Sequence, residues 1–111
     1  MAETNFLQAI EMTVYDTAGL TGTYAAINGT GTEEAVNVVK FYNASNVGVT
    51  LSYDGSTDQD FIPAGGTFIL DLETNASGFG GSSGHWMMRK GQVIYAKGSA
   101  GTGNLYFVGY Y

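Results

Sequence analysis

The sequence predicts an all-β protein, a single antiparallel β-sandwich of about eight strands with a jelly-roll-like arrangement. Short runs rich in Val, Ile, Thr, Phe and Tyr recur along the chain, and turn residues separate them at intervals typical of such sandwiches. No stretch carries a sustained apolar stripe with the 3.6-residue period of a helix. The 111 residues suffice for one domain, which we expect to span residues 1–111.

Nine runs have the composition of strands. They are Phe6–Val14, Thr23–Asn28, Val36–Tyr42, Val47–Tyr53, Gln59–Ile62, Thr67–Leu72, Trp86–Arg89, Val93–Lys97 and Leu105–Tyr111. Apolar residues alternate with small, polar or charged ones in Val47–Tyr53, and Thr67–Leu72 also has a period of two, which is typical of half-buried antiparallel strands. Residues 1–20 hold one such run, so they form either an ordinary first strand or an N-terminal arm that reaches a neighbour.

The connecting segments have the residues that turns require. Asn28-Gly29 and Asp54-Gly55 favour the left-handed conformations of tight hairpins. Pro63–Gly66 predicts a turn followed by a flexible corner of the chain. Ser99–Gly103 is expected to join the last two strands. The low-complexity segment 76–84 is expected to be a loop, with Phe79 at its centre.

The C-terminal strand has bulky side chains on both faces. Leu105, Phe107 and Tyr111 alternate with Tyr106, Val108 and Tyr110. A strand that is apolar on both faces is normally covered on both faces. One face should therefore meet the core, while the other meets either a neighbouring subunit or the protein's own loops. The residues we consider candidates for a protein interface are Phe79, Trp86, Met87, Tyr106, Val108 and Tyr110.

The charge composition excludes several kinds of partner. Ten carboxylates against four cations give a net charge of −6, and charged residues make up only 13% of the chain. Nucleic-acid binding depends on a basic surface, so nucleic acid is not an expected partner, and neither is an anionic membrane. Met1–Asn5 lacks the basic and apolar regions of a signal peptide, so none is expected.

Metal and cofactor sites find little support in the sequence. There is no cysteine, and His85 is the only histidine, so a zinc site lacks ligands. Asp54, Asp58 and Asp60 lie close together and form a weak calcium candidate, although their spacing does not match an EF-hand. A hairpin turn capped by aspartate explains them more simply. We expect no metal and no cofactor.

Enzymatic function is not predicted. No serine is placed in a strand-to-helix elbow beside His85, and nothing singles out a pair of carboxylates of the glycosidase kind. No catalytic residue is therefore assigned. The triplets that begin at Asn28, Asn43 and Asn75 match the N-glycosylation pattern, but in the absence of a secretory signal they are better explained as turn residues.

Four segments, taken in order, resemble small virion proteins of tailed bacteriophages. They are Gly19–Tyr24, Asn43–Gly55, Asp60–Gly65 and Tyr95–Gly103 followed by the aromatic strand, and they extend over nearly the whole chain. Each segment consists mainly of residues that favour turns and is not specific by itself, so the resemblance lies in the order of the four segments. It implies a β-sandwich that assembles on the particle as a decoration or cement protein, or as a base for fibres.

The resemblance leads to a non-enzymatic function. We expect a capsid decoration protein that is made in the host cytoplasm, resides in the virion and binds the major capsid protein or another virion protein. A homo-oligomer is expected, with a trimer as the natural guess. The alternatives are a tail or fibre adaptor that contacts a receptor, and a carbohydrate-binding module in which Trp86, Tyr106 or Tyr110 stacks on a sugar.

Overall fold

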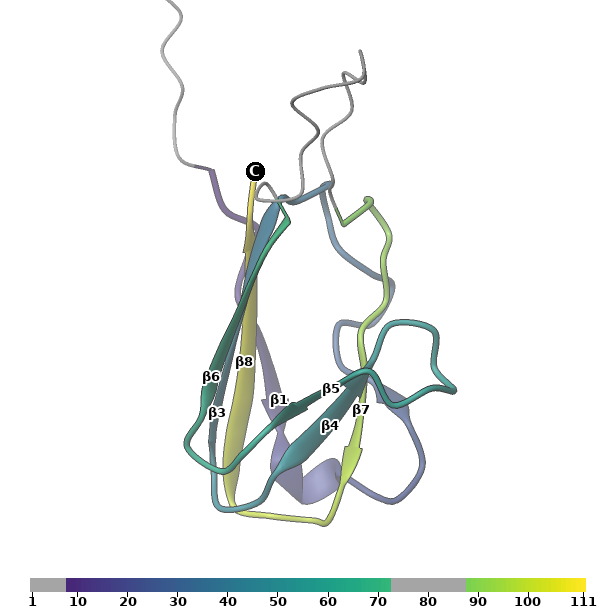
Figure 1. The fold of residues 1–111 in the computed structure, drawn as a ribbon, viewed down its shortest axis with the longest axis vertical. Coiled ribbons are helices and arrows are strands. Elements are labelled where there is room, and N and C mark those ends of the chain that lie inside the picture. Colours follow the sequence, from purple (N-terminus) through teal and green to yellow (C-terminus); the bar gives the residue numbers. More distant parts are fainter. Residues whose placement is uncertain (1–7, 73–87) are drawn as a thin grey trace, which may run out of the picture.

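The structure is a computed structural model that describes residues 8–72 and 88–111. Within these residues the chain forms eight β-strands and one short 3-10 turn, arranged as two stacked antiparallel sheets of four strands each (Figure 1). This arrangement confirms the predicted all-β sandwich. The more specific jelly-roll description stays a prediction.

The two sheets differ in the length of their strands. Sheet A contains, in spatial order, β1 (Thr13–Asp16), β8 (Gly103–Tyr110), β3 (Val38–Ser45) and β6 (Thr67–Asp71). Sheet B contains β2 (Ala25–Ala26), β7 (Tyr95–Gly98), β4 (Val49–Ser52) and β5 (Asp60–Ile62). The 3-10 turn η1 (Thr17–Gly19) follows β1. The longest strands, β3 and β8, pair from Val38 opposite Tyr110 to Ser45 opposite Gly103, and they form the middle of sheet A.

The core lies between the sheets because alternate residues of each strand point inward. The rings of Phe41 and Phe107 stack with their centroids 4.9 Å apart, and Phe68 stacks on the other side of Phe41 at 5.9 Å. These rings come from three neighbouring strands of sheet A, and Leu51 and Ile62 of sheet B are buried in the same cluster. The period of two predicted for the runs 47–53 and 67–72 is confirmed, because Val49 and Leu51 are fully buried and Phe68 and Leu70 pack against the core.

Several strands differ in extent from the sequence prediction. Among the described residues the first continuous strand is Thr13–Asp16, which pairs with β8 from Thr13 opposite Phe107, and residues 6 and 7 of the expected run Phe6–Val14 lie outside the described residues. Earlier in the chain, Ala9 makes a single bridge to Tyr110. The run Thr23–Asn28 is reduced to two paired residues, and from the run Trp86–Arg89 the structure describes one bridge, from Met88 to Val36.

Residues 8–20 belong to the sandwich. Ile10 and Leu20 are 6% and 2% exposed and lie in the core cluster. Asp16 caps η1 by accepting a hydrogen bond from the Ala18 N–H at 2.9 Å. Residues 10–20 therefore lie against the core of their own sandwich.

Candidate interaction surface

The face of sheet A that points away from sheet B is mostly apolar. Strand alternation sends the residues between the core positions to this side, and register places them in rows across the sheet. Val14 lies opposite Tyr106, which in turn lies opposite Tyr42. We call this surface the outer face and define it by Met12, Val14, Lys40, Tyr42, Ile69, Tyr106, Val108 and Tyr110.

The outer face exposes large apolar side chains next to one another. The exposed fractions are 52% for Met12, 51% for Val14, 43% for Tyr42 and 58% for Ile69. Single exposed apolar residues are ordinary on any protein, but a contiguous group of this kind marks an interaction surface. This group spans all four strands of sheet A, because Ile69 lies on β6 at one edge and Val14 on β1 at the other.

A groove of about 530 Å³ runs over the middle of the outer face, with Met12, Tyr106 and Tyr110 among the residues that line it. The rings of Tyr42 and Tyr106 stack with their centroids 6.1 Å apart and their planes at 15°. Lys40 contributes a cation to the groove, and within the described part of the chain its ammonium takes part in no ion pair. The groove therefore offers aromatic surface, aliphatic surface and one positive charge.

Three of the residues predicted as interface candidates lie on this face. They are Tyr106, Val108 and Tyr110, which are half-buried along β8. Phe79, Trp86 and Met87 lie outside the described residues. Sequence reasoning missed Met12, Val14, Tyr42 and Ile69. The signal was present for Ile69, because its run alternates and its apolar side chain stands at an outward position of that alternation.

One large apolar side chain is exposed on sheet B. Phe61 of β5 is 61% exposed, the highest value among the large exposed apolar residues described. Its ring lies across Gly48, where a Cβ atom would overlap the ring carbons, so the glycine makes room for it. Phe61 lines a shallow depression together with Leu20 and Ala100. We call Phe61 and this depression the Phe61 patch.

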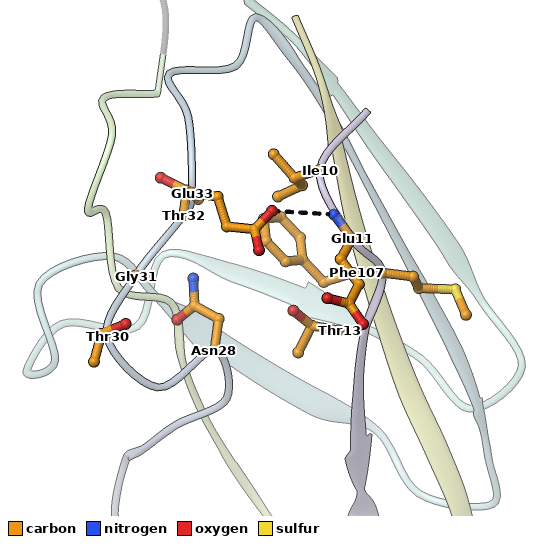
Figure 2. A pocket seen from close by; sticks show the side chains of 10 residues that line it. Ile10, Glu11, Thr13, Asn28, Thr30, Gly31, Thr32, Glu33 and Phe107 are labelled. Atoms are coloured by element: carbon orange, nitrogen blue, oxygen red, sulfur yellow. Dashed lines mark hydrogen bonds between the residues drawn. The ribbon is translucent and has the colours of Figure 1, made fainter. Parts of the chain in front are cut away.

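A polar cleft of about 220 Å³ opens between the loop 28–33 and the segment that leads into β1 (Figure 2). The side chains of two glutamates, Glu11 and Glu33, line this cleft. The backbone N–H of Glu11 donates a hydrogen bond to Glu33 Oε1 at 3.4 Å. Both glutamates are exposed. The structure thus places two glutamates at one open, polar cleft.

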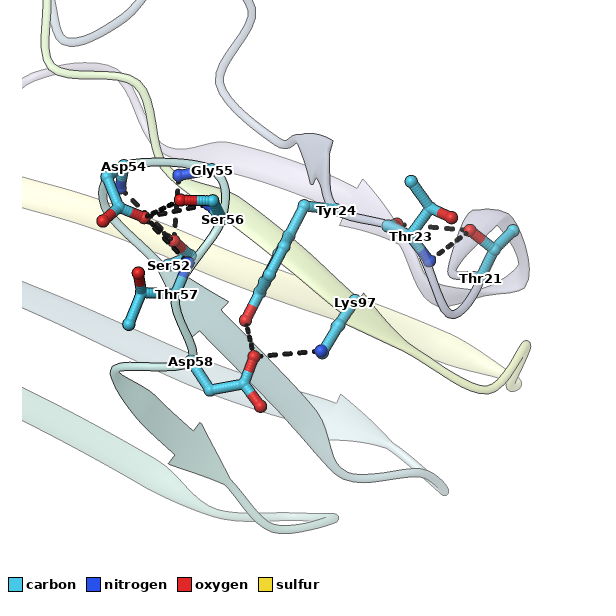
Figure 3. Close-up of polar contacts among 10 residues, drawn as sticks. All are labelled: Thr21, Thr23, Tyr24, Ser52, Asp54, Gly55, Ser56, Thr57, Asp58 and Lys97. Atoms are coloured by element: carbon cyan, nitrogen blue, oxygen red, sulfur yellow. Dashed lines mark hydrogen bonds and ion pairs between the residues drawn. The ribbon is translucent and has the colours of Figure 1, made fainter.

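Among the described residues the three aspartates proposed as a weak calcium site form no metal-binding group, and Figure 3 shows two of them, Asp54 and Asp58, each held by its own partners. Asp54 Oδ1 accepts hydrogen bonds from the backbone N–H groups of Ser56 and Thr57, both at 2.9 Å, and from Ser52 Oγ at 2.8 Å. These donors hold the pKa of the Asp54 carboxyl well below its usual range. The aspartate-capped turn, the simpler explanation of this loop, accounts for Asp54.

Asp58 and Asp60 have separate partners. Asp58 accepts a hydrogen bond from the Tyr24 hydroxyl and pairs with Lys97 Nζ at 2.9 Å, and both contacts lower the pKa of its carboxyl. Desolvation, followed by the bond to Asp58, raises the pKa of Tyr24 to about 12. Asp60 Oδ2 accepts from the Tyr53 hydroxyl at 2.6 Å. No group of three or more metal-ligating side chains occurs in residues 8–72 and 88–111.

Two of the three glycosylation-like triplets begin with an asparagine that has a structural contact. Asn28 accepts from the backbone N–H of Ile94 at 2.9 Å and donates to Gln92 O at 3.0 Å, so it joins the loop after β2 to the segment before β7. Asn43 is fully buried. Asn75 and His85 lie outside the described residues.

Comparison of the chain with protein-family models, with curated proteins and with solved structures found no match. Among the described residues no helix is long and apolar enough to cross a membrane.

Proposed function

We propose that this chain is a non-enzymatic structural protein of a bacteriophage particle, a decoration or cement protein that binds and stabilises the major capsid shell. The observation that carries the proposal is the outer face of sheet A, where Val14, Tyr42 and Ile69 expose apolar surface in one contiguous group. Exposure of this apolar face to water is unfavourable in free energy, and a protein that covers the face removes that unfavourable contribution.

The exposed ring of Phe61 offers a second, smaller point of contact with a neighbour. The outer face belongs to sheet A and the Phe61 patch to sheet B, so the two lie on different layers of the sandwich. A cement protein needs two surfaces, because it holds adjacent subunits together. The order of the turn segments resembles that of small virion proteins, and this resemblance is the reason to propose a phage particle as the assembly that the chain joins.

The test is the number of copies of this chain per purified particle, measured by quantitative mass spectrometry against the major capsid protein. A decoration protein is expected at hundreds of copies. A few dozen copies or fewer would instead support the tail or fibre adaptor. A particle that lacks the chain altogether would contradict both forms of the proposal.

A carbohydrate-binding module is the second candidate, because the groove on the outer face has features of a sugar site. Its volume of about 530 Å³ is that of a small-molecule site, and Tyr42, Tyr106 and Tyr110 line it. Aromatic rings bind the apolar faces of sugars, and Lys40 would favour an acidic one. Titration of intrinsic fluorescence with cell-surface glycans tests this candidate. A response that Tyr42→Ala abolishes would support it, and no response would contradict it.

A further inference from the structure

We propose that the outer face of sheet A is a homodimer contact, on which a second copy of this chain packs its own outer face. The four sheets would then be stacked in the order B, A, A, B. The inference rests on the proposed function in that this face is covered by protein, but it assigns the face to a second copy, so that contact with the shell falls to the Phe61 patch.

The first reason is that sheet A has the residue pattern of an inner layer. Facing sheet B, the rings of Phe107, Phe41 and Phe68 form a row across three strands. Tyr106 and Tyr42, which are next to Phe107 and Phe41 in the sequence, point to the opposite side of the sheet. There they form a second aromatic row. Strands with large apolar groups on both faces occur where both faces are covered. In the described part of the chain, only one face of sheet A is covered.

The second reason is the size of the exposed surface. Met12, Val14, Tyr42 and Ile69 are each about half exposed, and the half-buried Tyr106, Val108 and Tyr110 lie between them. With about 150–250 Å² for a whole large side chain, the face presents on the order of 500 Å² of apolar surface. The smallest stable interfaces bury about 600 Å² per partner. The apolar part alone therefore approaches what a dimer needs, and polar neighbours such as Asn104 add to it.

The third reason is shape. Two copies of one sheet have the same twist, and sheets of equal twist pack face to face with their strands about 30° apart. Consider a two-fold axis in the plane of the contact, parallel to β8 and β3 and midway between them. It places β8 of one copy over β3 of the other. The contact is then isologous, so it closes at two subunits and predicts a dimer where the sequence suggested a trimer.

The fourth reason is charge. The chain as a whole carries −6, which makes two copies repel each other. Across β1, β8, β3 and β6, the charged side chains at outward positions are Lys40, Asp16 and Asp71. One cation and two carboxylates amount to −1, and the carboxylates lie on the two edge strands. The outer face is therefore a nearly neutral part of an acidic molecule, and copies meet there with little repulsion.

Sedimentation equilibrium of the purified full chain tests the inference. We expect a monomer–dimer equilibrium with a Kd on the order of 1–100 μM. Val14→Lys and Ile69→Lys each place a charge on the contact and are expected to raise this Kd about tenfold or more, and together about a hundredfold. Phe61→Lys is the matched control, because Phe61 is as exposed as Ile69 but lies on sheet B, and its Kd should equal that of the unmodified chain.

Three results would overturn the inference: a chain that stays monomeric up to about 1 mM, a trimer, or a dimer that Phe61→Lys dissociates and Val14→Lys with Ile69→Lys does not. Thermal unfolding of each variant verifies that the variant folds. If a variant fails to fold, the association state of the unmodified chain still tests whether a dimer forms. Because these measurements use the isolated chain, they are independent of the copy number in particles. A monomer that is abundant in the virion would contradict the dimer and leave the proposed function standing.

Discussion

Asn43 is the residue at which the two sheets are joined by side-chain hydrogen bonds. It lies on β3 of sheet A and is fully buried, and its Nδ2 donates to the carbonyl oxygens of Val47 at 2.7 Å and of Ile62 and Pro63 at 3.1 Å. Its Oδ1 accepts from Ser45 Oγ at 2.6 Å. Both atoms of the amide are thus satisfied, as burial of a polar group requires.

Replacing Asn43 with aspartate should destabilise the fold strongly. The carboxylate would turn an acceptor toward three carbonyl oxygens and would lose every bond that the two N–H groups of the amide donate, at a cost of about 3 kcal/mol or more in the free energy of unfolding. Denaturant unfolding at pH 7 measures it. Asn46→Asp is the control, because Asn46 Oδ1 accepts from the Thr102 N–H and an aspartate keeps that bond. Equal losses in the two variants would contradict this account.

Asp54 makes the stability of the protein depend on acid pH. Hydrogen bonds from Ser56, Ser52 and Thr57 favour its charged form and lower its pKa from the ordinary value of 3.8. Around pH 4 the unfolded chain therefore binds a proton that the folded chain does not. The contribution of Asp54 to stability is complete above this pH and is lost progressively as the pH falls below it.

Asp54→Asn should therefore flatten the decline in stability between about pH 4 and pH 2, because an amide does not titrate in this range. The measurement is the urea midpoint of unfolding at a series of pH values for the variant and the unmodified chain. At neutral pH the variant is expected to be the less stable of the two, since a neutral oxygen accepts weaker hydrogen bonds. The same acid slope in both proteins would show that Asp54 does not cause it.

At the scale of elements, the pairing of β3 with β8 depends on Gly103. This residue begins β8 with a φ of 122°, which L side chains rarely adopt. A Cβ atom there would overlap the carbonyl oxygen of Ala44 and lie 2.7 Å from the Cα of Ser45, at the end of β3. The close approach of these two strands thus requires glycine.

Gly103→Ala is expected to lower the free energy of unfolding by about 2 kcal/mol or more, because steric overlap adds to the backbone strain. Gly29→Ala is the matched control, since Gly29 also has a positive φ, 59°, but has nothing within 4 Å of the added atom. It should cost about 1 kcal/mol. Denaturant unfolding of both variants gives the comparison, and similar costs would mean that the overlap relaxes without effect.

The sequence predicted the middle elements better than the first ones. For the runs 47–53, 59–62, 67–72 and 105–111, local alternation and flanking turns locate the strands, and the structure has β4, β5, β6 and β8 there. Phe6–Val14 has an equally strand-like composition. In its described part Ala9 makes a single bridge to Tyr110 and continuous pairing starts at Thr13, because the position of a strand also depends on where a partner strand lies.

At the scale of the whole molecule, net charge sets how association responds to salt. Each copy carries −6, while the proposed contact is apolar, so screening should strengthen the dimer. Between about 0.05 M and 0.5 M NaCl we expect the Kd to fall several-fold. Lys40→Gln removes the only cation of the outer face and should make this salt dependence steeper.

Sedimentation equilibrium at several NaCl concentrations, for the unmodified chain and for Lys40→Gln, measures the effect. A Kd that rises with salt would show that ion pairs hold the dimer together. It would contradict the assignment of the contact to apolar surface.

The sequence by itself determined the all-β class, most strand positions and the presence of large side chains on both faces of the last strand. These features are local, because alternation and turn residues act within a few positions. Only the tertiary structure decided that β8 lies inside sheet A between β1 and β3, and that Tyr106 therefore meets Tyr42 and Val14. Alternation separates two faces of a strand, but long-range pairing decides which apolar face is buried in the core and which is left exposed.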